Sequence, residues 1–189
     1  YGALYTVALT VGLRLGEALG LTWDDINFDE GTLRVRQAVQ YSNGHTHLVE
    51  PKSNTSRRSI SLPTLTLAAL ERHKDRQEAR RKDKDRPALA NPHKLVFLSR
   101  SGGLLNPSSA TRRFQEKLEE AGLPTMRFHD LRHSTATLLL SRGVHPRLVM
   151  ELLGHSQISL TMNTYSHVIP QMQRETATAM DGLLATGGA

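Results

Sequence analysis

The chain opens with apolar residues at helical spacing. Five of them follow one another at intervals of three or four positions: Leu4, Ala8, Val11, Leu15 and Leu19. This spacing is typical of a helix with one buried face, and Gly20 lies where such a helix would end. We therefore predict one helix that ends at Gly20 and has Arg14 inside its apolar pattern. An arginine in that position can extend its stem along apolar surface and carry its charge to solvent.

The pattern then changes from helical spacing to alternation. Residues 32–40 alternate, Ser42-Asn43-Gly44 is typical of a tight hairpin turn, and residues 45–51 form the returning strand. A second turn over 52–56 leads into a third strand over 58–62. These segments predict a small three-stranded antiparallel sheet. Lys52 stands at the tip of the second hairpin, where a long cationic side chain can reach outward.

The rest of the chain is mostly helical. A helix is expected from Thr64, and its continuation over 71–86 contains eight basic and five acidic residues, which favours a solvated helix that passes into a loop. A short strand is expected over 94–99. Asn106-Pro107 is a good helix start, with Gly122 as its stop, and two more helices are expected over 130–142 and 146–153. A last amphipathic stretch is expected after residue 168; its apolar residues are Ile169, Met172, Met180 and Leu183.

Composition narrows the class of protein. At 189 residues, the length is that of one domain with a genuine core. The net charge of +6 and a pI near 10.0 suggest a polyanionic partner, most often nucleic acid. The chain has no cysteine, which excludes disulfides and thiolate chemistry, and no apolar run of membrane-spanning length, so a cytoplasmic or nucleoid location is expected. Because it begins at Tyr1 within an apolar helical pattern, it resembles a piece of a longer protein.

Several residues able to act on a phosphodiester stand at the boundaries of these elements. They are Arg14, Lys52, His129, Arg132, His155 and Tyr165. Arginine forks match phosphate oxygens, and two of them can neutralise the charge of a pentacoordinate phosphorane. A tyrosine hydroxyl can attack phosphorus if a neighbour such as histidine shares its proton, and a lysine can protonate the departing oxygen. Each residue alone also has an ordinary structural explanation, but together they complete a metal-free phosphoryl transfer.

A different interpretation concerns His129 and His133. They are four positions apart on one helix face, as in some zinc sites. Metalloproteases place a glutamate directly after the first histidine, whereas this chain has Asp130. We expect no metal or other cofactor, and the zinc interpretation remains an alternative to be tested.

These motifs resemble those of the tyrosine recombinases, or phage-type integrases, over Thr10 to His167. The matching blocks are Gly12-Leu13-Arg14-Leu15-Gly16-Glu17, the turn residue Lys52, His129-Asp130-Leu131-Arg132-His133, and Leu153-Gly154-His155 with Tyr165 ten positions after His155. The resemblance implies an α+β, mostly helical catalytic-domain fold with a small three-stranded antiparallel sheet, spanning residues 1–189. It also implies that the amino-terminal DNA-clamping domain of such proteins is missing from this chain.

The resemblance assigns roles to the six residues. Arg14 and Arg132 would clamp the scissile phosphate, with His155 donating to the same oxygens. Tyr165 would be the nucleophile, Lys52 the general acid, and His129 would position or deprotonate the tyrosine. Glu17, three residues after Arg14, would support that arginine.

The implied activity is site-specific cleavage and rejoining of DNA through a covalent 3′-phosphotyrosine. Two alternatives are a type IB topoisomerase and a DNA-binding regulator that has lost the chemistry. The expected partner is double-stranded DNA, on which the full-length protein would form a tetramer, while this chain alone would be monomeric; accessory DNA-bending or directionality proteins could take part. Residues 168–184 are expected to form a helix that docks on a neighbouring subunit, or else packs on its own domain.

Overall fold

The computed structural model describes residues 1–50, 57–83 and 90–154, with six further residues between 174 and 182. Its elements begin with α1 (Gly2–Val11), α2 (Leu15–Leu19) and a short 3-10 turn, η1 (Trp23–Asp25). The strands are β1 (Ile26–Asn27), β2 (Thr32–Val35), β3 (Ala38–Ser42), β4 (His45–Val49) and β5 (Arg58–Ser61). The longer helices are α3 (Thr64–Lys82), α4 (Pro107–Glu120), α5 (Phe128–Ser141) and α6 (Pro146–Leu153).

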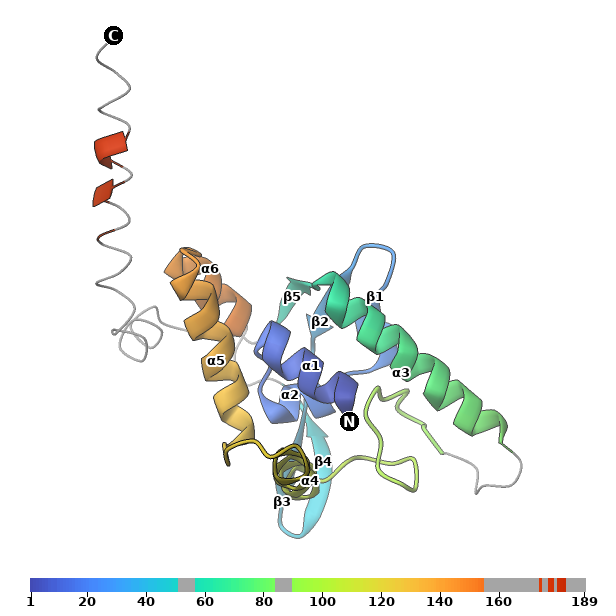
Figure 1. The fold of residues 1–189 in the computed structure, drawn as a ribbon. Helices are drawn as coiled ribbons and strands as arrows, with labels where there is room; N and C mark the ends of the chain where they lie inside the picture. Colours follow the sequence, from blue (N-terminus) through green and yellow to red (C-terminus); the bar gives the residue numbers. More distant parts are fainter. Residues whose placement is uncertain (51–56, 84–89, 155–173, 175–176, 179, 183–189) are drawn as a thin grey trace.

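Helix α1 is the centre of the domain. It lies between α3 and α5 and contacts both (Figure 1). Its buried residues include Leu4, Val7 and Val11, each fully buried in the main apolar core. A smaller core joins α5 to α6 through Leu140, Val149 and Leu153. This arrangement confirms the expected α+β, mostly helical class with a small antiparallel sheet.

The predicted first helix is wrong in one respect, because it is broken into α1 and α2. Gly12 ends α1 in the left-handed conformation, at φ 67°, and its amide donates to the carbonyl of Ala8 at 3.1 Å. Leu13 is buried in the gap between the helices. The apolar spacing did not reveal the break because both helices turn their apolar residues towards the same core.

The sheet also differs from the prediction in which strands it pairs. The three-stranded antiparallel sheet has the order β1-β2-β5, with Leu33 opposite Ile60, and β3 and β4 form a separate two-stranded ribbon. The expected strand over 32–40 is interrupted at Arg36 and Gln37. Arg36 is paired with the buried Asp25, and the Gln37 amide donates to the carbonyl of Gly20 at 2.8 Å. These two side-chain bonds redirect the chain from one sheet into the other.

The segment predicted as a strand over 94–99 is not a strand, because it bends at Val96 and Phe97 and pairs only through single bridges, Thr22 to Leu95 and Leu98 to Leu104. Side chains of α3 take the place of a partner strand here. The carbonyl of Val96 bonds to His73 Nε2 at 2.8 Å and accepts from Gln77 Nε2 at 3.1 Å. Burial lowers the pKa of His73, and the hydrogen bond to Val96 partly opposes this by raising it.

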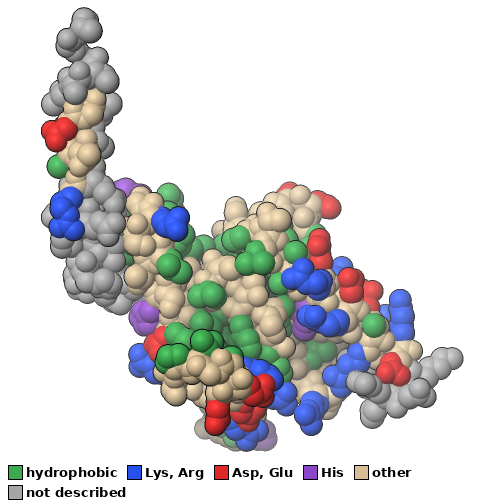
Figure 2. All heavy atoms as spheres, viewed as in Figure 1, with side chains coloured by type: hydrophobic (Ala, Val, Ile, Leu, Met, Phe, Trp, Pro, Cys, Tyr) green, Lys and Arg blue, Asp and Glu red, His purple; other side chains and the backbone are tan. Residues whose placement is uncertain are grey.

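The predicted helices that begin at Thr64 and Pro107, and those over 130–142 and 146–153, are confirmed. Asn106 caps α4 by accepting from the amides of Ser108 and Ser109, and α6 ends at Gly154 in the left-handed conformation, at φ 65°. Helix α3 is largely solvated along its charged half and extends to Lys82. Lys and Arg side chains, with Asp and Glu among them, cover this side of the molecule (Figure 2). None of the helices in the described part of the chain is both long and apolar enough to cross a membrane.

Candidate active site

The break between α1 and α2 brings Arg14 to the start of a helix. Arg14 is the N-cap of α2 and has an extended backbone. Its guanidinium Nη1 donates to Glu17 Oε1 at 2.8 Å, and its backbone amide donates to Glu17 Oε2 at 3.1 Å. The Arg14 side chain remains 41% exposed. The predicted support of Arg14 by Glu17 is therefore present, and the arginine is held while still accessible to a ligand.

Arg132 comes from the first half of α5 and is buried, with 2% of its surface exposed. Its Nη1 donates to the carbonyl of Gly12 at 2.7 Å, and its Nη2 donates to the carbonyl of Leu153 at 2.6 Å. Arg132 thus joins the end of α1 to the end of α6. The structure brings the two predicted arginines together at the same place in the fold.

A third arginine, Arg58 on β5, lies beside them and was not singled out in the sequence. Its side chain is 8% exposed; Nη2 donates to Glu17 Oε2 at 2.9 Å and Nε donates to the carbonyl of Leu152 at 2.7 Å. A signal was present in the strand pattern, because Arg58 stands two positions before the buried Ile60 and so faces the same side of the sheet.

The three arginines converge on the carboxyl end of α6. Consecutive carbonyls accept from them: Leu152 from Arg58, Leu153 from Arg132, and Gly154 from Arg14 Nη2 at 3.5 Å. The last carbonyls of a helix lack partners within the helix and carry its partial negative charge, so cations bind there favourably. His155 is the next residue in the chain and lies outside the described residues. The residue before it, Gly154, is held in this cluster by the bond from Arg14 to its carbonyl.

Glu17 is the carboxylate that balances this cluster. It is buried, with 6% of its surface exposed. Burial alone would raise the pKa of Glu17, but the hydrogen bond and charge of Arg58, followed by those of Arg14, lower it below its usual value. Counting Arg14, Arg58 and Arg132 against Glu17 leaves the cluster with an excess of positive charge, which suits an anionic ligand.

His129 lies one helical turn from His133, at the start of α5. Their rings meet edge to face, with centroids 4.8 Å apart and planes at 82°. Partial burial lowers the pKa of His129 from its usual value, and the nearby charges of His133, Arg132 and Arg14 lower it further, while Asp130 opposes them. His129 is therefore biased towards the neutral imidazole, the form that can accept a proton.

The remaining predicted residues, Lys52, His155 and Tyr165, lie outside the described residues, as does most of the expected helix over 168–184. Lys52 is in the segment between Glu50 and Arg57, which form an ion pair at 2.6 Å. Among the described residues no group of three or more His, Cys, Asp or Glu could hold a metal.

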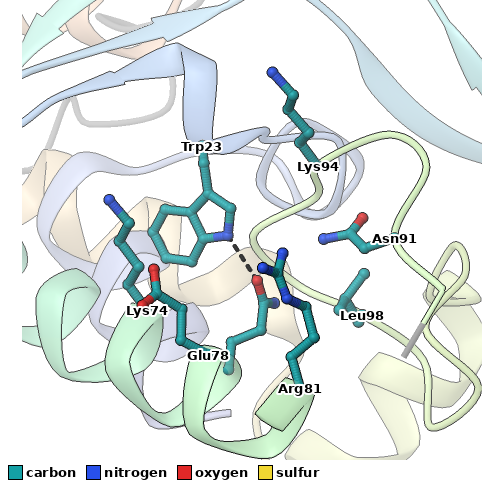
Figure 3. Close-up of a pocket in the computed structure, with 8 residues that line it drawn as sticks. Trp23, Lys74, Glu78, Arg81, Asn91, Lys94 and Leu98 are labelled. Carbon is teal, nitrogen blue, oxygen red and sulfur yellow. Dashed lines mark hydrogen bonds between the residues drawn. The ribbon is translucent and has the colours of Figure 1, made fainter. Parts of the chain in front are cut away.

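A pocket elsewhere on the domain has a different character. It has a volume of about 260 Å³ and lies between α3 and the segment that includes Asn91 and Leu98 (Figure 3). The Trp23 indole forms one wall and donates to Gln77 Oε1 at 2.7 Å, and the Lys74 ammonium lies 5.9 Å from its ring centroid. None of the three predicted site residues that the structure describes, Arg14, His129 and Arg132, lines this pocket, so it is separate from the arginine cluster.

Comparison with known proteins gives the family to which this domain belongs. Residues 2–172 match the description "Phage integrase family". This chain belongs to the phage integrase family, which confirms the resemblance seen in its motifs.

Its relatives carry recombinase and integrase names. The chain is 35% identical to a "Tyrosine recombinase XerC-like" protein of Caldanaerobacter subterraneus, with 96% of this chain and 49% of the relative covered. It is 29% identical to the ICEBs1 integrase of Bacillus subtilis, with 97% and 49% covered. The chain therefore spans about half the length of the curated relatives it matches.

Solved structures show the same fold. The Tn1549 transposon integrase, in complex with transposon right end DNA, matches with a TM-score of 0.76 at 24% identity, covering 95% of this chain and 58% of that one. XerA recombinase matches with a TM-score of 0.70 at 23% identity, covering 94% and 57%. The fold is thus that of the catalytic part of tyrosine recombinases.

Proposed function

We propose that this chain is the catalytic part of a site-specific DNA recombinase or integrase that cleaves and rejoins strands through a 3′-phosphotyrosine. One observation supports this most directly. Arg14 and Arg132, from motifs far apart in the sequence, both bond to the carboxyl end of α6, directly before His155. That arrangement gathers guanidinium groups at the end of α6, directly before His155 in the chain, and phosphodiester chemistry requires such fixed donors.

The charge of the cluster fits a phosphate. Arginine remains protonated at any working pH and matches phosphate oxygens in geometry. Arg14 offers the more exposed guanidinium, and Arg132, besides its proposed part in stabilising the phosphorane, bonds the backbone of Gly12 and Leu153. Replacing Arg14 by alanine should therefore slow cleavage with little effect on DNA affinity, because binding is spread over many phosphates while transition-state charge meets a few fixed donors.

The proposed reaction needs no energy source. The oxygen of Tyr165 attacks the phosphorus, and the bond from phosphorus to the 5′ oxygen breaks. Lys52 gives its proton to the departing 5′ oxygen, while His129 positions the tyrosine or takes its proton, and Arg14, Arg132 and His155 stabilise the phosphorane. A 5′ hydroxyl from a second duplex then attacks the phosphotyrosine and releases Tyr165, so the bond energy is retained.

Partners and location follow from this activity as proposals. The Tn1549 integrase was solved in complex with transposon DNA and XerH with its difH substrate, which supports double-stranded DNA as the partner here. We propose that the full-length protein forms a tetramer on DNA, with residues 168–184 docking on a neighbouring subunit, and that it acts in the cytoplasm on nucleoid DNA. Accessory DNA-bending or directionality proteins would assist assembly.

Covalent trapping tests the proposal. The full-length protein is mixed with a pool of nicked duplexes of random central sequence, and protein–DNA adducts that survive denaturation are recovered and sequenced. The wild type should yield adducts on a defined sequence, and Tyr165→Phe, which lacks only one hydroxyl, should yield none while binding the same DNA. An undiminished adduct with Tyr165→Phe would overturn the assignment.

Two further assays separate the alternative activities. Joining of strands between two selected sites supports a recombinase, whereas relaxation of supercoiled plasmid without exchange would identify a topoisomerase. Sequence-specific binding with no adduct would identify a regulator without chemistry.

A further inference from the structure

Arg58 occupies an unusual position for a charged side chain. It belongs to β5, opposite Val35 of β2, and its side chain is almost fully enclosed. A buried cation is costly unless it is paired and hydrogen-bonded. Glu17 supplies the paired charge and the carbonyl of Leu152 supplies a further acceptor.

The bonds that Arg58 makes to Glu17 and to Leu152 lead to different parts of the candidate site. Through Glu17 it is connected to Arg14, because the same carboxylate accepts from both guanidinium groups. Through the carbonyl of Leu152 it is connected to the end of α6, where the next carbonyl, that of Leu153, accepts from Arg132. Arg58 therefore ties the sheet to α2, at whose start Arg14 lies, and to the end of α6, to which Arg132 also bonds.

We propose that Arg58 is a positioning residue for strand cleavage. It sets the orientation of Arg14 through Glu17, and it holds the end of α6 from which His155 follows. It acts through these neighbours and not on the phosphate itself. This inference rests on the proposed function and adds a residue to it.

The geometry of the guanidinium explains why arginine is needed. Nε and Nη2 donate to acceptors on two different elements, Leu152 of α6 and Glu17 of α2. A lysine at this position has one nitrogen on a flexible stem and would keep the charge but lose the fixed fork. Displacement of Arg14 or His155 by about 1 Å can slow catalysis on the order of 10²-fold.

The test compares Arg58→Lys with a matched surface change, Arg147→Lys. Arg147 pairs with Glu151 at 2.8 Å on the exposed side of α6. The full-length protein is mixed with a nicked duplex of the trapped sequence at saturating concentration, and the rate and final amount of adduct are measured beside the Kd for DNA. A second substrate carries a neutral methylphosphonate at the scissile position, which reduces the need for oriented arginines.

We expect Arg58→Lys to form adduct on the order of 10²-fold more slowly, with the same final amount and nearly unchanged Kd. The defect should shrink on the methylphosphonate substrate, and Arg147→Lys should match the wild type on both. A reduced final amount with an unchanged rate would indicate only a loss of folded protein and would overturn the inference. An equal slowing on both substrates would overturn it as well.

If Arg58→Lys does not fold, Glu17→Gln/Arg58→Met removes both buried charges together, and the same comparison of substrates applies. A wild type that forms no adduct on any DNA would refute the proposed function and this inference together. A wild type that forms adduct at the same rate as Arg58→Lys would refute this inference alone.

Discussion

Replacement of Glu17 by glutamine should weaken the fold far more than a surface substitution of the same kind. The wild-type carboxylate accepts from Arg14 Nη1 at 2.8 Å, from the Arg14 amide at 3.1 Å and from Arg58 Nη2 at 2.9 Å. The glutamine amide keeps one acceptor oxygen but removes the charge and turns a donor towards a guanidinium. Arg58 then stays enclosed and loses the negative charge of Glu17.

The magnitude follows from that burial. Removing one partner of a buried ion pair costs about 3–5 kcal/mol. The free energy lost with the Glu17–Arg58 pair should be close to this range, because both side chains are enclosed. The free energy lost with the Glu17–Arg14 pair is smaller, because solvent screens the exposed Arg14. Since each kcal/mol shifts Tm by about 2–4 °C in a domain of this size, a loss of about 3 kcal/mol would lower Tm by about 6–12 °C.

The assay is urea unfolding of Glu17→Gln beside Glu151→Gln, whose carboxylate pairs with Arg147 at the surface. Glu151→Gln should cost about 1 kcal/mol or less. Acid should reduce the difference in unfolding free energy between wild type and Glu17→Gln. Because the pKa of Glu17 is lower in the folded protein than in the unfolded chain, the ionised carboxylate stabilises the fold above the unfolded pKa. This stabilisation is lost as the pH falls through the folded pKa. A cost for Glu17→Gln equal to that of Glu151→Gln at neutral pH would refute this account of the cluster.

Three other outcomes are expected. Gly12→Ala should lower the free energy of unfolding by more than the roughly 1–2 kcal/mol that a left-handed backbone costs an alanine, because the new Cβ would also lie 2.5 Å from Leu153 Cδ2. A loss below about 1 kcal/mol in urea unfolding would contradict the close packing. If neutral His129 accepts a proton, the rate of adduct formation should rise with pH, and the midpoint of that rise should lie below about 6.5. His133→Gln should move the midpoint to higher pH, because it removes a nearby charge that lowers the pKa of His129. An unmoved midpoint would show that His133 does not affect the titration of His129. Cleavage should persist in EDTA, and loss of activity on chelation that zinc restores would support the metal interpretation of the two histidines instead.

The sequence by itself determined much of the helical part of the fold. Asn106 and Gly154 mark helix ends through local chemistry, a capping side chain in one case and a left-handed glycine in the other, so these ends were predictable. The family motifs likewise named Arg14 and Arg132, because their spacing is a property of the chain alone. The support of Arg14 by Glu17 was predictable because the residues are three positions apart.

Long-range contacts decided the rest. The break after Gly12 does not disturb the apolar spacing, and it makes sense only once Leu153 and Arg132 pack against that glycine. The pairing of β2 with β5 in place of β4 depends on bonds that Arg36 and Gln37 make to distant residues. The role of Arg58 was hidden for the same reason. Its alternation in the strand showed which way it faces, but only the folded domain supplies Glu17 and the end of α6 as partners that make a buried arginine stable.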